Sequence, residues 1–170
     1  MALVLKTSER KLSGVRIPYP PLMIRQQVKR SLKMTGDQGE VDVVEKIVCP
    51  NCGKKMSQLP NSFPLYDLQC TACNFRAQVK SSNSSNRKVV RGADWDIMEK
   101  VLKSGFLIPP LITNNKWLEK GVERQEIRLY PFIRKRDLIK YKANIKSRNR
   151  AYYMFNYNLK DQIFFVLYKK

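Results

Sequence analysis

Two neighbouring stretches decide the fold of this chain: C-P-N-C-G at residues 49–53 and L-Y-D-L-Q-C-T-A-C-N-F-R-A-Q-V-K at residues 65–80. Each contains a C-x-x-C turn, which holds two sulfur atoms where one tetrahedral metal ion can bind both. Gly53 directly follows the first pair and supplies the permissive backbone that a zinc knuckle needs. The spacing predicts a zinc site with four ligands: Cys49, Cys52, Cys70 and Cys73. Because four thiolates leave no open coordination position, we expect the zinc ion to be structural.

Other uses of the four cysteines fit the sequence less well. A disulfide needs an oxidising compartment, for which the sequence gives no sign. A thioredoxin-like redox pair accounts for one C-x-x-C motif but not for two at zinc-ribbon spacing. We therefore predict a zinc-ribbon insertion at about residues 47–76.

A second pattern surrounds the second cysteine pair. Asp67 precedes Cys70, and Gln78-Val79-Lys80 follows Cys73. On neighbouring strands, the carboxylate of Asp67 and the side-chain carbonyl of Gln78 could bind one face of Mg²⁺. Lys80 would share a strand face with Gln78, where it could orient a water molecule for attack on a phosphodiester. Taken alone, this pattern also fits a turn aspartate and a surface lysine.

The combined motifs resemble the catalytic domain of the DpnI-type, Dam-replacing restriction endonucleases. In that family a four-cysteine zinc ribbon is inserted into a PD-(D/E)XK nuclease core, and the metal-binding Asp stands where Asp67 stands here. The resemblance places Gln78 at the second metal-binding position, Lys80 at the catalytic lysine, and Glu40 at the acid that an N-terminal helix directs into the active site. It covers roughly residues 37–160 and is most specific from residue 49 to residue 80.

The resemblance implies a mixed α/β fold, with a central mixed β-sheet flanked by helices and a PD-(D/E)XK core. It implies a prokaryotic, cytoplasmic type II restriction endonuclease that hydrolyses double-stranded DNA at a specific site with Mg²⁺. We expect a homodimer, because a palindromic site mirrors a two-fold axis. A cognate DNA methyltransferase encoded elsewhere would be its partner.

The chain departs from the family pattern at two places. Gln78 stands where an acid is usual, and a neutral carbonyl attracts a metal ion less strongly than a carboxylate does. Gln-x-Lys variants do occur in related nucleases such as the Mrr-like restriction enzymes. The chain ends at Lys170, where the family continues into a winged-helix domain. We therefore expect no such domain and infer no preference for methylated adenine.

The charge of the chain is strongly positive. There are 33 Lys and Arg residues against 14 Asp and Glu, which gives a net charge of +19. A surplus this large attracts polyanions, of which nucleic acid is the commonest. The basic segment 134–150 and the aromatic and amide residues after it predict a set of DNA contacts: Lys140, Lys142, Lys146, Arg148, Arg150 and Asn156. The alternative is a solvated basic face without a specific role.

Composition and periodicity predict one domain over residues 1–170, with an N-terminal arm at about residues 1–20. No apolar run approaches the roughly 20 residues that span a bilayer, so we expect no membrane contact. The start of the chain does not resemble a signal peptide. The predicted helices cover residues 21–35, 37–48, 94–103 and 138–141, and the predicted strands cover residues 66–69, 75–80, 106–112 and 126–130. Loops are expected at residues 54–64 and 81–88, and a closing hairpin at residues 152–157 and 163–168.

Two other functions fit the same sequence. The first is a non-catalytic zinc-ribbon protein that binds DNA or RNA. The second is a structure-specific or repair nuclease built on the same core. Divalent-metal-dependent cleavage that is lost on changing Asp67 separates the first from a restriction enzyme, and a defined cut site separates the second.

Overall fold

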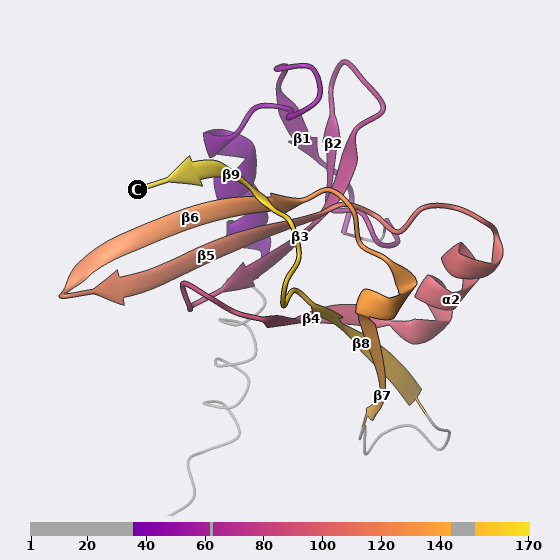
Figure 1. Cartoon of the computed structure of the whole chain (residues 1–170). Coiled ribbons are helices and arrows are strands. Elements are labelled where there is room, and N and C mark those ends of the chain that lie inside the picture. Colours follow the sequence, from indigo (N-terminus) through magenta and orange to yellow (C-terminus); the bar gives the residue numbers. More distant parts are fainter. Residues whose placement is uncertain (1–35, 62, 144–151) are drawn as a thin grey trace, which may run out of the picture.

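The computed structural model describes residues 36–61, 63–143 and 152–170 (Figure 1). The expected N-terminal arm, the helix expected at residues 21–35, and three predicted DNA-binding residues (Lys146, Arg148 and Arg150) lie outside this part of the chain. The described elements are, in chain order, a helix over residues 36–46, β1 (Met56–Gln58), β2 (Leu68–Cys70), β3 (Arg76–Ser82), β4 (Val89–Asp94), α2 (Trp95–Lys103), β5 (Leu111–Glu119), β6 (Val122–Tyr130), a short 3₁₀ helix (Lys135–Asp137), β7 (Leu138–Ala143), β8 (Tyr152–Asn158) and β9 (Phe165–Lys169).

The described strands form two sheets, which gives a mixed α/β fold. A curled six-stranded sheet has the order β1-β2-β3-β5-β6-β9, and a three-stranded antiparallel sheet has the order β4-β8-β7. Within the larger sheet β3 and β5 are parallel, so the chain between them must cross over, and it does so through β4 and α2. Figure 1 shows β5 and β6 as a long hairpin that extends to one side of the molecule.

The six-stranded sheet separates two hydrophobic clusters. On one face Val79 of β3 packs with side chains of the 36–46 helix. On the other face Leu111 of β5 packs with α2 and with the three-stranded sheet. Because side chains alternate along a strand, Gln78 and Lys80 lie on the opposite face from Val79, toward the three-stranded sheet. This alternation positions the candidate site.

The helix predicted at residues 94–103 is confirmed as α2. The side chain of Asp94 caps it by accepting a hydrogen bond of 2.8 Å from the backbone N–H of Asp96. The helix ends at Ser104, and Gly105 follows with a φ of +76°, a conformation that glycine adopts without strain. The helix predicted at residues 37–48 covers residues 36–46 of the described chain. Within the described residues, no helix has the length and apolar character that a membrane crossing needs.

Strand boundaries differ from the prediction along the whole described chain; for example, β2 covers Leu68–Cys70 and β3 covers Arg76–Ser82. The strand predicted at residues 106–112 was wrong in its first half, since β5 begins only at Leu111. Pro109 and Pro110 precede it, and proline has no backbone N–H to donate to a neighbouring strand. The loop predicted at residues 54–64 contains β1, whose Met56 pairs with Cys70. The strand predicted at residues 126–130 is longer and starts at Val122.

The C-terminal third of the described chain differs most. The short helix predicted at residues 138–141 was wrong, because this segment is strand β7. The predicted closing hairpin was wrong too, because β8 pairs with β4 and β7, whereas β9 pairs with β6 in the other sheet. Short apolar runs do not distinguish a helix from a strand, and sequence alone does not show which sheet a strand joins.

Candidate functional site

The four cysteines form one cluster beside the β1–β2 hairpin. Their sulfur atoms all lie within 4.8 Å of one another. Sγ of Cys49 lies 3.6 Å from Sγ of Cys73, and Sγ of Cys52 lies 3.4 Å from Sγ of Cys70. A tetrahedral ion with Zn–S bonds of about 2.3 Å holds its sulfurs about 3.8 Å apart. The four thiols are free, and their arrangement fits zinc.

Backbone geometry explains why the sulfurs converge. Gly53 has a φ of +71°, and its N–H donates to the carbonyl of Cys49 at 2.8 Å, which closes the first turn. In the second turn the pKa of Cys73 is lowered to about 6, first by the backbone N–H of Phe75 and then by the side-chain amide of Asn51. A lower pKa favours the thiolate, which is the form that binds a metal.

Asp67 stands where β2 separates from β3. The two strands pair from Leu68 and Ala77 onward, so β2 starts too late to pair with Val79. The carboxylate of Asp67 takes that place, and its Oδ2 accepts a hydrogen bond of 2.6 Å from the N–H of Val79. Nζ of Lys80 lies 3.9 Å from the same oxygen. The fold thus fixes a partly exposed carboxylate beside a lysine at an open edge of β3.

Glu40, on the 36–46 helix, faces the same region. Its pKa is raised to about 7, first by burial and then by the negative charge of Asp67. Together with Asp37, these two residues line a cleft of about 320 Å³, which we call the acidic cleft. Carboxylates that share a cleft repel one another, and a divalent cation would relieve that repulsion.

Gln78 lies behind the acidic cleft rather than in its wall. It is 3% exposed, and its Oε1 accepts a hydrogen bond from the hydroxyl of Tyr157 on β8. Tyr157 is fully buried, and its pKa is raised by burial and then by the charge of Asp67. Sequence analysis missed Tyr157. It stands 79 residues from Gln78, and no local pattern indicates their contact.

The oxygen donors at this place fit a hard divalent cation. Mg²⁺ prefers oxygen ligands, and the carboxylates of Asp67 and Glu40 line one cleft. A carbonyl oxygen has two lone pairs, so Oε1 of Gln78 keeps one while it accepts from Tyr157, but this side chain is buried behind the cleft. Lys80 adds a positive charge next to Asp67. The group could therefore bind a metal and stabilise negative charge on a phosphate.

A buried amide network holds the Glu40 helix in place. Nδ2 of Asn114 on β5 donates to the backbone carbonyl of Gly39 at 3.1 Å. Oδ1 of Asn114 accepts from Gln125 on β6 at 2.8 Å, and Nζ of Lys46 donates to Gln125 at 2.6 Å. Two of these contacts join the helix to β5 and β6, and the third joins the two strands to each other, so the network fixes the position from which Glu40 reaches the cleft.

The predicted DNA-binding residues that the structure describes do not all share a face. Nζ of Lys140 on β7 lies 5.0 Å from the centroid of the Trp95 ring. In the β7–β8 register Asn156 is opposite Ile139. Because adjacent strand residues point to opposite faces, Asn156 faces away from Lys140 and Lys142. DNA would have to reach around this strand pair to contact all three.

The fold and the site define a mixed α/β protein that combines an acidic cleft with a cluster of four cysteines that could hold a metal ion. The family model described as "DpnI: Dam-replacing family" matches residues 22–128, more than half of the chain. The chain belongs to this family, which is related to restriction endonucleases, and membership indicates a restriction-type nuclease, a hydrolase that acts on DNA. None of the curated proteins matches the chain. The matched residues include the cysteines and Glu40, Asp67, Gln78 and Lys80, whereas Tyr157 lies outside them.

Proposed function

We propose that this protein is a type II restriction endonuclease with a PD-(D/E)XK core, which cuts double-stranded DNA at a specific site with Mg²⁺. The observation that carries the proposal is the convergence of Asp67, Glu40 and Lys80, from three separate segments, in a chain of the DpnI family. Zn²⁺ in the four-cysteine cluster would stabilise the β1–β2 hairpin, and Asp67 lies in the connection between these two strands, directly before β2.

Each residue has a distinct role in this proposal. Asp67 and Glu40, with the Gln78 carbonyl, would hold Mg²⁺, which when bound polarises the scissile phosphate and lowers the pKa of a water ligand. Lys80 orients the attacking water and offsets negative charge on the phosphate in the transition state. Tyr157 holds the Gln78 amide in one orientation through its hydroxyl. The basic surface, which includes Lys140 and Lys142, attracts the DNA backbone.

Two active sites related by a two-fold axis can cut both strands of a palindromic site in one complex, so we propose a homodimer. A cognate methyltransferase would protect the host DNA. A prokaryotic cytoplasm is the compartment that fits both partners.

Sequencing the ends of digested DNA tests this proposal. Methylated and unmethylated genomic DNA are each incubated with the protein and Mg²⁺, and the ends are mapped. Ends that share one short sequence support a site-specific enzyme. Ends at junctions or lesions indicate a repair nuclease instead, and intact DNA that is tightly bound indicates a non-catalytic zinc-ribbon protein.

A further inference from the structure

A second cavity has the opposite chemistry to the acidic cleft. Its volume is about 600 Å³, within the range of about 300–1,000 Å³ that is typical of ligand sites. Its wall includes Tyr66, Phe75, Arg76, Phe106, Leu107 and Pro110. We call it the aromatic pocket. Among the described residues that line it, arginine provides the charge and none is acidic.

The two cavities are lined in part by residues that are adjacent in the sequence. Tyr66 lines the aromatic pocket, and Asp67, the next residue, lines the acidic cleft. Arg76 precedes Gln78 by two positions on β3, so both side chains start from the same face of the strand. Because Tyr66 and Asp67 are consecutive residues, their Cα atoms are about 3.8 Å apart, so one short segment contributes to the walls of both cavities.

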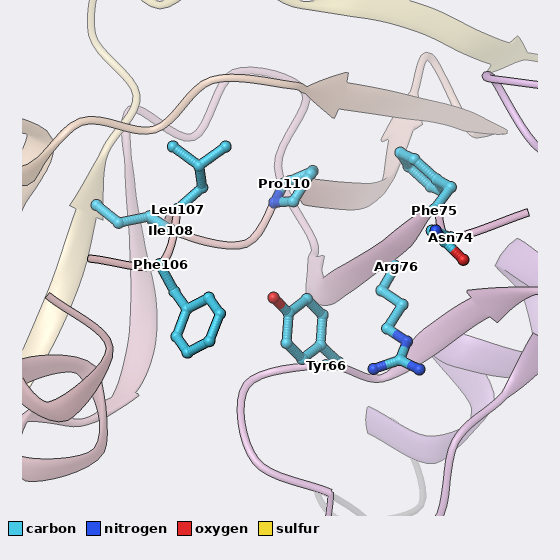
Figure 2. A pocket seen from close by; sticks show the side chains of 8 residues that line it. All are labelled: Tyr66, Asn74, Phe75, Arg76, Phe106, Leu107, Ile108 and Pro110. Carbon is cyan, nitrogen blue, oxygen red and sulfur yellow. The ribbon is translucent and has the colours of Figure 1, made fainter. Parts of the chain in front are cut away.

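Aromatic side chains in this pocket present flat surfaces at its opening. Figure 2 shows Phe106 approaching Tyr66 from the loop after α2, with Arg76 extending on the other side of Tyr66. The ring of Phe63 lies 6.3 Å from that of Tyr66, and the Arg76 guanidinium lies 5.7 Å from the Phe63 ring. Flat rings beside a guanidinium are the groups on which nucleobases stack.

The loop that carries Phe106 is anchored at both ends. Its start is the helix cap at Ser104, which is followed by Gly105. Its end is fixed by the buried Ile108 and by a hydrogen bond of 2.9 Å from the N–H of Gln78 to the carbonyl of Pro110. Phe106 is nevertheless 74% exposed. The fold thus holds a large aromatic ring in solvent, next to the candidate active site, where an occupant could cover it.

We propose that the aromatic pocket binds one nucleobase of the DNA substrate that has left the helical stack, beside the phosphate that is cut. The inference rests on the proposed function, since DNA as the substrate follows from the family. A stacking pocket favours an unstacked base, because a duplex presents only base edges and phosphates to a protein. Arg76 supplies a donor for the base edge or for its phosphate. Arg76 is the charged residue in this lining, so charge complementarity favours an anionic occupant, and the phosphates that flank a nucleobase supply that charge.

A duplex with one unpaired base tests the pocket without cleavage. The probes are a duplex that carries a single unpaired 2-aminopurine and the fully paired duplex of equal length, titrated at one salt concentration without added Mg²⁺. We expect the wild-type protein to bind the bulged duplex about tenfold more tightly, with a change in 2-aminopurine fluorescence as the base stacks. Phe106→Ala and Leu107→Ala should each reduce this preference and leave the affinity for the paired duplex within about twofold.

A matched control is Phe165→Ala, which removes an exposed phenylalanine from edge strand β9. It should keep the full preference. Equal affinity of the wild-type protein for both duplexes overturns the proposal, and so does a loss of affinity for both duplexes in Phe106→Ala. A change in oligomeric state of Phe106→Ala by sedimentation, with the preference unchanged, would assign the pocket to contact between copies and overturn it too.

The same titration separates this inference from the nuclease proposal. If the protein prefers the bulged duplex but never cuts DNA, the base-binding pocket is supported and the nuclease proposal is rejected. If the protein cuts DNA at one site but does not prefer the bulged duplex, the nuclease proposal is supported and the base-binding pocket is rejected.

Discussion

The four-cysteine cluster and the acidic cleft come from the same short stretch of sequence, yet they are built in different ways. In the cluster every ligand is set by two tight turns, and all four sulfurs converge within 4.8 Å. In the acidic cleft, Asp67 comes from this stretch of sequence, but Glu40 comes from the 36–46 helix. Gln78, which lies behind the cleft, is held by Tyr157 of β8. A closed metal site can be specified by local spacing, whereas an open one depends on distant elements.

The geometry of the cleft therefore depends on residues that are distant from it in the sequence, whereas the geometry of the cysteine cluster follows from its own two turns. Asn114 holds the carbonyl of Gly39, one residue before Glu40. A Cβ at Gly39 would lie 1.9 Å from Oγ of Ser81 and 3.1 Å from its Cβ, so a side chain there would force Ser81 to move. The predictions below test this difference, from the largest expected effect to the smallest.

Loss of a zinc ligand should have the largest effect. Cys70→Ser removes a buried thiolate, and structural zinc sites contribute on the order of 10 kcal/mol to folding. We expect about one zinc per chain in the purified wild-type protein, and in the variant both loss of zinc and a lower melting temperature. Elemental analysis and thermal unfolding measure this. Ser57→Ala, on the adjacent β1, should keep its zinc. A wild-type protein without zinc would contradict the assignment.

Lys80→Ala should lower the cleavage rate by about 10²–10⁴-fold, the range for loss of a group that assists proton transfer or stabilises charge. DNA affinity should change little, because Lys80 is one cation among many. Single-turnover cleavage and filter binding on the same preparation separate the two effects. The control is Lys55→Ala, which removes a lysine directly before β1. Equal rates for the two variants would show that Lys80 is only a surface cation.

Substitutions at Gln78 and at its partner Tyr157 should change the Mg²⁺ concentration that cleavage requires more than they change the stability of the protein. Gln78→Glu restores a charge and should lower the Mg²⁺ concentration for half-maximal cleavage, whereas Gln78→Ala should raise it strongly. Tyr157→Phe removes one hydrogen bond, worth about 1 kcal/mol, and should raise the requirement about fivefold. Combining Tyr157→Phe with Gln78→Ala should add nothing further. Additive effects would mean that Tyr157 does not act through Gln78.

Surface lysines should give the smallest effect. Lys140→Gln combined with Lys142→Gln should reduce the slope of log affinity against log salt by about two, because each phosphate contact contributes about 0.9 to it. Lys100→Gln combined with Lys103→Gln on α2 is the matched pair, with the same change of charge. Identical slopes for both pairs would show that the β7–β8 face has no special part in DNA binding.

Local chemistry explains which parts of the molecule were predicted from sequence. The cysteine spacing and the apolar periodicity of residues 94–103 each act over a few residues, so α2 and the convergence of the four cysteines were predicted correctly. The pairing of β8 and β9 with different sheets depends on contacts between distant segments, and the predicted hairpin failed there. Tyr157 was missed for the same reason, since only the folded chain brings it to Gln78.

The central claim is that the Asp67 carboxylate is the main metal-binding group of a DNA-cutting site. The most direct measurement compares the wild-type protein with Asp67→Ala in one assay that records both DNA binding and cleavage, with and without Mg²⁺. The account predicts Mg²⁺-dependent cleavage by the wild-type protein, and a rate at least about 10³-fold lower for Asp67→Ala, because loss of metal stabilisation costs several kcal/mol. DNA affinity without Mg²⁺ should stay within about threefold. Cleavage by Asp67→Ala at the wild-type rate, or a wild-type protein that binds DNA but never cuts it with Mg²⁺, would contradict the account.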